Sequence, residues 1–94
     1  MEFEFDPAKD EANRTKHGLS LAFGMRVFDH DDHVVISSHR LVDGEDRFKA
    51  IGLVEGKLYT AIHVWRGDAI RLISVRRSNA GEQRDYDRHT GRSG

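Results

Sequence analysis

The chain of 94 residues has no cysteine, one proline and one tryptophan, and it has no long run of apolar residues. Without cysteine, the protein can form no disulfide, carry no thiolate nucleophile and build no cysteine-based zinc site. The longest apolar stretches fall far short of the ~20 residues that a membrane-spanning helix needs. No basic N-terminal segment leads into an apolar stretch, so the sequence predicts no signal peptide. These absences favour a soluble cytoplasmic protein that does not associate with a membrane.

Charge is plentiful, and its sign changes along the chain. Hydrophobic residues make up 37% and charged residues 33% of the sequence, which is typical of one small globular domain. The formal net charge of −1 combines −4 in residues 1–60 (8 Lys/Arg against 12 Asp/Glu) with +3 in residues 61–94 (7 against 4). All seven of these C-terminal cations are arginines, whose planar fork of donors matches phosphate. The split therefore favours phosphate binding, with attraction between the two halves as the alternative explanation.

Two helices are predicted in the N-terminal third of the chain. Asp6 and Pro7 suit a helix start, because aspartate can cap free N–H groups and proline fits the first helical position. Gly18 suits a left-handed C-terminal cap, so the first helix is expected over 8–17. A second helix is expected directly after Ser20, which can cap it.

Four strands and a final helix are predicted in the rest of the chain. The strands are expected over 34–36, 47–54, 58–65 and 69–77, with a polar link over 37–46. Two-residue turns join the last three strands into an antiparallel meander. Asn79 can cap the final helix together with Glu82. The sequence therefore predicts an α+β fold in one domain over 1–88, with two N-terminal helices, a four-stranded mainly antiparallel sheet, a C-terminal helix and a flexible tail over 89–94.

Alternation along the strands divides the sheet residues between two faces. The more aliphatic face is expected to pack under the helices and carries Arg47, Lys49, Ile51, Leu53, Leu58, Thr60, Ile62, Val64, Arg71, Ile73, Val75 and Arg77. The other face is expected to be open and carries Phe48, Ala50, Gly52, Tyr59, Ala61, His63, Trp65, Ile70, Leu72, Ser74 and Arg76. A single β-bulge in either hairpin would exchange part of the two sets. Gly52 marks either such a bulge or a close backbone approach.

Short segments of the chain, each unspecific by itself, form an ordered set over residues 3–87. They are Phe3-Glu4-Phe5-Asp6-Pro7-Ala8-Lys9, Asn13 with Lys16-His17-Gly18, Ala22 with Val27-Phe28-Asp29, Glu45-Asp46-Arg47-Phe48, Ala50-Ile51-Gly52, Arg66-Gly67-Asp68, Ile70-Arg71-Leu72-Ile73-Ser74-Val75-Arg76-Arg77, and Glu82, Arg84 and Tyr86. In this order the set resembles the BrnT family of bacterial toxins, which belongs to the RelE-like ribonuclease superfamily.

The resemblance implies a RelE-like fold whose twisted antiparallel sheet binds RNA on a concave face. It also implies cleavage of mRNA, free or on the ribosome, that needs no metal or cofactor and inhibits translation. The implied partner is a BrnA-like ribbon-helix-helix antitoxin whose C-terminal part wraps the toxin, and operator DNA is bound only through the complex of the two proteins. The alternative is a non-catalytic binding module, a decayed toxin that retains antitoxin or RNA binding.

Cleavage of this kind needs groups that hold phosphate and groups that move protons. Arg76 is the first candidate for phosphate, because it lies in a matched segment and on the face expected to be open. Arg71 and Arg77 follow, because one bulge would bring them round. His63 is the candidate for proton transfer, since imidazole titrates near neutrality. The alternatives are an ion pair or solvation at a strand end for each arginine, and a buried strand histidine with a satisfied hydrogen bond for His63.

RNA binding is expected to extend beyond these catalytic candidates. Lys9, Lys16 and Arg47 can reach phosphate, and Tyr59 and Trp65 can stack on unpaired bases. Solvated helix faces are the alternative for the two lysines, and a local ion pair is the alternative for Arg47.

Two histidine-containing segments are assigned no catalytic role. His17 ends the first helix, where capping is its favoured role. The acidic run over 29–33 contains two histidines but matches no zinc pattern, so a solvated loop is the favoured interpretation and no metal site is predicted.

Overall fold

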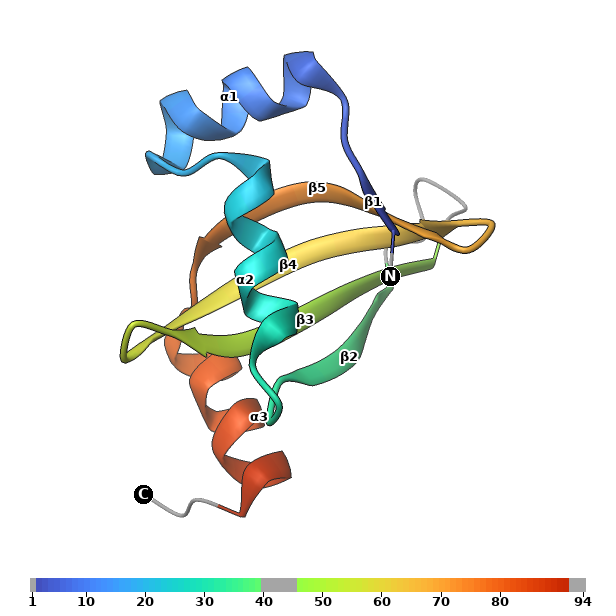
Figure 1. The fold of residues 1–94 in the computed structure, drawn as a ribbon. Helices are drawn as coiled ribbons and strands as arrows, with labels where there is room; N and C mark the ends of the chain where they lie inside the picture. The colour runs from blue at the N-terminus through green and yellow to red at the C-terminus, as the bar shows by residue number, and fades with distance from the viewer. Residues whose placement is uncertain (1, 40–45, 92–94) are drawn as a thin grey trace.

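The sheet comes mostly from the second half of the chain, and helices precede and follow it. The structure is a computed structural model and describes residues 2–39 and 46–91. In chain order the elements are β1 (Glu2–Glu4), α1 (Pro7–His17), the 3₁₀ turn η1 (Leu21–Phe23), α2 (Gly24–Asp29), β2 (Val34–His39), β3 (Asp46–Val54), β4 (Lys57–Arg66), β5 (Ala69–Arg77) and α3 (Ala80–Thr90). None of the helices in these residues is long and apolar enough to cross a membrane. The fold is α+β, as predicted (Figure 1).

The strands form one mixed sheet in the order β1-β5-β4-β3-β2. Strands β3 to β5 make the predicted antiparallel meander, and β2 adds to it by pairing antiparallel with β3. The prediction of four strands is wrong, because β1 pairs in parallel with β5 and adds a fifth. Three residues are too few to show a periodic pattern in the sequence. Phe3 of β1 packs instead by tertiary contact, with its ring centroid 5.3 Å from that of Phe28.

The sequence signals at the helix ends are confirmed. Asp6 caps α1 by accepting a hydrogen bond from the Ala8 amide at 2.9 Å. Gly18 ends the same helix in the left-handed region, with φ of 72°. Asn79 and Glu82 form a reciprocal capping box at the start of α3. Local polar chemistry therefore sets these boundaries, which is why they can be read from the sequence.

Other boundaries differ from the prediction. Ser20 caps a 3₁₀ turn, so the second α-helix begins only at Gly24. Strand β2 continues to His39, three residues beyond the predicted end at 36. The rest of the predicted polar link, residues 40–45, lies outside the described residues. Helix α3 continues to Thr90, two residues past the predicted domain end at 88. Residues 92–94 of the predicted tail also lie outside the described part of the chain.

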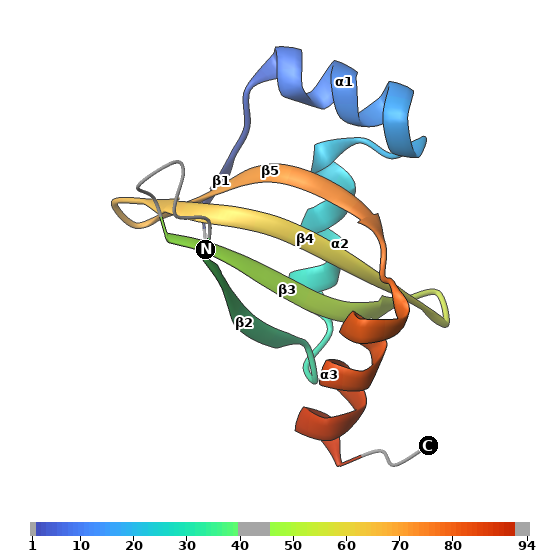
Figure 2. The same cartoon turned by 180° about the vertical axis from the view of Figure 1, so that it is seen from behind.

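Helix α2 and the turn η1 cover the sheet face that is expected to be open, so that expectation is wrong. The buried core consists of Leu21, Val27, Ala50, Val54, Ala61, Ile70, Leu72 and Val75. Figures 1 and 2 show α2 across this face and α3 on the opposite one. The covered face is poorer in large aliphatic side chains, but its small residues let a helix come close and pack densely.

Two glycines permit the close approach of α2 to the sheet. A Cβ on Gly24 of α2 would lie 2.8 Å from Val75 Cγ2. A Cβ on Gly52 of β3 would lie 2.8 Å from the backbone oxygen of Val27 in α2. Both distances are shorter than side chains tolerate, so hydrogen is the only side chain that fits unchanged. The prediction of a close backbone approach at Gly52 is confirmed.

A β-bulge in β5 reverses the alternation of its side chains between the two faces of the sheet. Ile62 pairs with Ser74, but the next residue, His63, pairs with Leu72, which leaves Ile73 as the extra residue. Before the bulge, β5 points Leu72 into the helix-covered core. After the bulge the alternation is reversed, so the side chains at positions 75 and 77 share the helix-covered face and those at 74 and 76 share the other.

The side chain of Asn13 anchors α1 to β5 just after this bulge. Its amide donates to the backbone oxygens of Leu19 and Val75, both at 2.9 Å. Its oxygen accepts from the Val75 amide at 3.1 Å and from the Ser74 hydroxyl at 3.2 Å. Because β1 pairs only with the first part of β5, this buried side chain supplies the ladder partners that a neighbouring strand would otherwise provide.

Helix α3 packs against β2 and β3 on the second face. Its Tyr86 is buried, and the phenol shares a hydrogen bond of 3.0 Å with Nε2 of His30, which follows α2. The loop after α2 and helix α3 are thereby linked at one end of the sheet. The part of the second face that α3 leaves uncovered carries the site described next.

The close approach at Gly52 predicts a position-specific stability effect. Gly52→Ala should lower the free energy of unfolding by about 1–3 kcal/mol, because the new methyl group meets backbone that cannot move aside. Urea denaturation followed by circular dichroism measures this change. Gly81→Ala in α3 is the matched control: its Cβ would have no neighbour nearer than 3.5 Å, and alanine is the better helix former. Equal unfolding midpoints for the two variants would contradict the account.

Candidate functional site

A pocket of about 380 Å³ opens on the second face of the sheet. It is lined by residues from α1 and from four strands: Lys16, His17, Ser38, Arg47, Lys49, Ile62, Ile73, Ser74 and Arg76. This set is called the basic pocket below. Its described lining holds four cationic side chains and no carboxylate, over a floor that includes two isoleucines. Such a surface attracts anions and can hold phosphate oxygens.

The local structure explains why these cations meet. Arg47 and Lys49 lie two residues apart on β3 and therefore point to the same face. The bulge at Ile73 turns Arg76 to this face as well. Lys16 lies in the last turn of α1, a helix that Asn13 holds against β5. The pocket thus depends on strand alternation, on one bulge and on one buried amide.

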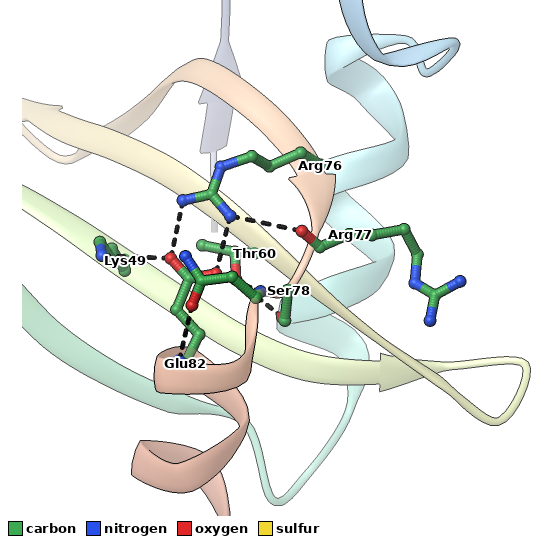
Figure 3. Close-up of polar contacts among 7 residues, drawn as sticks. Lys49, Thr60, Arg76, Arg77, Ser78 and Glu82 are labelled. Atoms are coloured by element: carbon green, nitrogen blue, oxygen red, sulfur yellow. Dashed lines mark hydrogen bonds and ion pairs between the residues drawn. The ribbon is translucent and has the colours of Figure 1, made fainter.

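The Glu82 carboxylate forms the densest polar cluster in the described structure. Both of its oxygens accept hydrogen bonds of 2.7 Å from the Arg76 guanidinium, in a bidentate pair. Lys49 Nζ lies 3.1 Å from one oxygen, and Thr60 donates to the other at 3.0 Å. The Asn79 amide donates to the same carboxylate at 2.9 Å. Figure 3 shows these side chains converging from α3 and three neighbouring strands.

Glu82 remains ionised although only 2% of its surface is exposed. Burial alone would raise the pKa of this carboxyl, but the hydrogen bonds from Arg76, the Asn79 amide, Lys49 and Thr60 outweigh it and lower the pKa to about 2. The same hydrogen bond raises the pKa of the Arg76 guanidinium, against the effect of its own burial. Glu82 therefore neutralises part of the pocket's charge while it holds two of the pocket's cations in place.

A second hollow of about 240 Å³ adjoins the basic pocket along α1. The two share Lys16, His17, Ile73 and Ser74. The second hollow, called the α1 groove below, adds Lys9, which lies about two helical turns nearer the start of α1 than Lys16 does. Cationic side chains therefore continue from the pocket along α1.

Four of the site residues predicted from the sequence lie on this continuous surface. Arg76, Arg47 and Lys16 line the basic pocket, and Lys9 lines the α1 groove. Their functional roles remain predictions. What the structure adds is their placement on one surface.

His63 lies away from this surface, because it is on the helix-covered face. Its side chain is only 1% exposed and lies between the rings of Phe28 and Phe48, with centroids at 5.0 and 5.8 Å. Its Nδ1 donates to the backbone oxygen of Ala61 at 3.1 Å. Desolvation by burial lowers the pKa of His63, although the hydrogen bond to Ala61 acts in the opposite direction. The predicted exposed surface shared by His63, Tyr59 and Arg76 is therefore wrong, since the face that it requires is covered.

The other predicted residues are also placed elsewhere. Arg71 pairs with Glu4 of β1 at 3.1 Å, five residues and roughly 16 Å along the strand from Arg76. Arg77 points away from Glu82 (Figure 3) and stacks over Tyr59, with 5.5 Å between the guanidinium carbon and the ring centroid. The ring of Tyr59 in turn packs edge-on against that of Phe23, with 4.7 Å between the ring centroids.

Trp65 is exposed but does not line the basic pocket. Its side chain is 49% exposed, and it borders a separate open hollow together with Asp46, Phe48, Val64 and Arg66. It pairs across strands with Ile70, which points into the core, so Trp65 belongs to the helix-covered side of the sheet. Base stacking at Trp65 would therefore involve a different surface from the basic pocket.

Three residues of the site are missing from the sequence-based set. Lys49 was placed on the right strand, but on a face expected to be buried. Glu82 is predicted from the sequence only as part of the helix cap. Its contacts with Arg76, Lys49 and Thr60 on the sheet cannot be read from the sequence. His17 has the spacing of a helix end, yet the cap is made by Gly18, whose amide donates to the Arg14 carbonyl, while the imidazole lines the pocket.

In residues 2–39 and 46–91, no three His, Asp or Glu side chains come close enough together to hold a metal ion. The chemistry that the described pocket can perform with its own groups is anion binding by Arg and Lys and proton transfer by imidazole.

An α+β fold with a cationic pocket and groove on one sheet face is suited to a protein that acts on a phosphate-rich polymer. The family described as "Ribonuclease toxin, BrnT, of type II toxin-antitoxin system" matches residues 5–82, and the chain belongs to this family. The matched range contains all described residues of the basic pocket, and Glu82 as well. A comparison with curated proteins finds no match. The protein is thus a ribonuclease toxin of a toxin–antitoxin pair, and an antitoxin is its partner.

The Glu82 cluster predicts the acid sensitivity of the fold. The carboxyl has a lower pKa in the folded chain than in the unfolded chain, so its stabilising contribution is complete above about pH 4.5 and is lost as the pH falls toward 2. Glu82→Gln should lower the free energy of unfolding near pH 7 by about 2–4 kcal/mol, because Arg76 and Lys49 lose their counter-charge. The variant should also show a flatter pH dependence below pH 4.5.

Urea titrations at a series of pH values measure both effects. Glu55→Gln is the matched control, since Glu55 is 76% exposed and lies 3.8 Å from Arg26. It should leave stability unchanged. Parallel acid unfolding of the wild-type chain and Glu82→Gln would contradict the assigned charge cluster.

Proposed function

We propose that the chain cleaves mRNA at the basic pocket and thereby inhibits translation. The observation that carries this proposal is the convergence of Lys16, Arg47, Lys49 and Arg76 from α1, β3 and β5 on one hollow within the family's matched range. An isolated cation on a protein surface would be unremarkable, but four that meet over a polar pocket match the charge of an RNA backbone.

The chemistry in this proposal uses the RNA's own 2′-hydroxyl as the nucleophile. The hydroxyl attacks the adjacent phosphorus, and the enzyme must hold the phosphate in line and neutralise the charge that grows on its oxygens. Arg76 suits this task because Glu82 fixes its guanidinium in one orientation, with N–H groups to spare for a phosphate oxygen. Arg47 and Lys49 would neutralise charge from the β3 side of the pocket.

Flanking nucleotides would follow the α1 groove. Lys9 and Lys16 lie along it, so the RNA backbone would run from the sheet toward the start of α1. Because this binding is electrostatic, it should weaken as salt is added. In this proposal the substrate is mRNA, either free or bound to the ribosome.

The proposed antitoxin is a BrnA-like ribbon-helix-helix protein, and operator DNA would be bound only by the complex. This partner assignment rests on the family to which the chain belongs. The alternative function is a non-catalytic toxin that retains antitoxin or RNA binding, and the experiment below separates the two.

Brief induction of the chain in bacterial cells, followed by mapping of RNA 5′ ends, tests the proposed activity. The wild-type chain should arrest growth and create new mRNA ends. Arg47→Gln should lower the frequency of those ends by about 10²-fold, as expected when a cation that stabilises the phosphate charge is removed. Arg47 is preferred to Arg76 because its replacement leaves the bidentate pair with Glu82 in place.

Arg71→Gln and Arg77→Gln are the matched controls, since both arginines lie outside the basic pocket. They should cleave as well as the wild-type chain. Growth arrest without new RNA ends would show that translation is blocked by binding and would overturn the nuclease. Loss of cleavage in the controls, with Arg47→Gln unaffected, would place the site elsewhere.

A further inference from the structure

His17 brings an uncommitted imidazole to the basic pocket. It is the last residue of α1, and its side chain lines both the basic pocket and the α1 groove. Within residues 2–39 and 46–91, the His17 ring takes part in no hydrogen bond. By contrast, the other histidines with described side chains, His30, His33, His63 and His89, each have a hydrogen-bond partner. The His17 ring nitrogens are therefore available to a ligand in the pocket.

The charged side chains that line the described pocket with His17 are all cationic, and Glu82 pairs with two of them, Lys49 and Arg76. Lys16 is its neighbour on α1, Arg76 lies on β5, and Arg47 and Lys49 lie on β3. Partial burial, followed by the charges of Lys16 and Arg76, lowers the pKa of His17 below its ordinary value of 6.5. The imidazole is consequently mostly neutral at pH 7 and keeps a lone pair that can accept a proton.

The other side chains of the pocket are poorly suited to this task. Arginine and lysine are protonated near neutrality and carry no free lone pair. The hydroxyls of Ser38 and Ser74 ionise only at far higher pH. Among the described lining residues, His17 alone combines a position in the pocket with titration near neutrality.

We propose that His17 is the general base that takes the proton from the RNA 2′-hydroxyl. This inference rests on the function proposed above, the cleavage of mRNA at the basic pocket. It gives a catalytic role to His17, for which the sequence favours a role as a helix cap. In the step, the 2′-oxygen forms a bond to phosphorus while its proton passes to the imidazole. The bond between phosphorus and the 5′-oxygen breaks, and the leaving oxygen takes its electron pair and a proton from water. The products are a 2′,3′-cyclic phosphate and a 5′-hydroxyl end.

The test uses the full chain and a labelled single-stranded RNA of mixed sequence under single-turnover conditions, from about pH 5 to pH 9. With the protein kept well below saturation, so that the rate reports the free protein, the wild-type rate should rise with pH and level off, with a midpoint below the ordinary imidazole value of 6.5. His17→Gln should lose this dependence and cleave about 10²-fold more slowly or worse. Binding of the same RNA with 2′-O-methyl groups, which cannot react, should be unchanged in the variant, because glutamine retains a polar group and all four cations remain.

His89→Gln is the matched control, because His89 lies at the exposed end of α3 and bonds only to the Asp85 carbonyl in the described structure. It should match the wild type in rate and binding. His17→Ala provides an independent readout: added imidazole should restore part of its cleavage rate, which no purely structural role of His17 predicts. Thermal unfolding of each variant shows whether it is folded.

Each outcome decides one of the two assignments. If His17→Gln cleaves RNA with the same rate and pH dependence as the wild-type chain, His17 is not the general base. The ribonuclease function is then unaffected. A loss of RNA binding as large as the loss of rate, without imidazole rescue, also overturns the base assignment and makes His17 a binding residue. If cleavage needs the ribosome, the same variants are compared on a translating mRNA in cell extract. No cleavage by the wild-type chain in either setting overturns the proposed function itself.

Discussion

The structure depends on one buried negative charge, the carboxylate of Glu82. A carboxylate with almost no solvent contact is stable only if other groups replace the lost hydration. Arg76 and Lys49 do so from the sheet, and the Asn79 amide does so from the start of α3. One interaction therefore attaches the last helix to the sheet, orients two of the pocket's cations and lowers the pocket's net charge. The cluster around Glu82 therefore both stabilises the fold and forms part of the candidate site.

The two faces of the sheet are built for different purposes, and the bulge at Ile73 makes this possible. Ahead of it, β5 contributes Leu72 to the core beneath α2. Behind it, the strand turns Arg76 toward β3 on the opposite face. Asn13 satisfies the backbone just after the bulge and brings the end of α1 to the pocket rim. A strand with unbroken alternation would have pointed Arg76 into the apolar core.

Local chemistry was readable from the sequence, and long-range geometry was not. The caps at Asp6 and Asn79 were predicted correctly because each acts within a few residues. The predicted covered face is wrong, because the small side chains that admit α2, and not the aliphatic content, determine which face is covered. Arg76 was nevertheless placed on the open face, since the wrong choice of face and the unseen bulge cancelled. The bulge does not affect the face on which His63 lies, so the wrong choice of face leaves His63 buried. His17 reaches the pocket instead.

The central claim is that the RNA backbone binds the basic pocket, on the sheet face opposite α2. Backbone amide NMR during titration with a 2′-O-methyl RNA of mixed sequence tests it directly, because this RNA binds but cannot be cleaved. The account predicts the largest shift changes at Lys16, His17, Ser74 and Arg76, with weaker changes as salt is raised. Changes concentrated around Trp65 and the helix-covered side of the sheet, with the pocket amides unmoved, would contradict it.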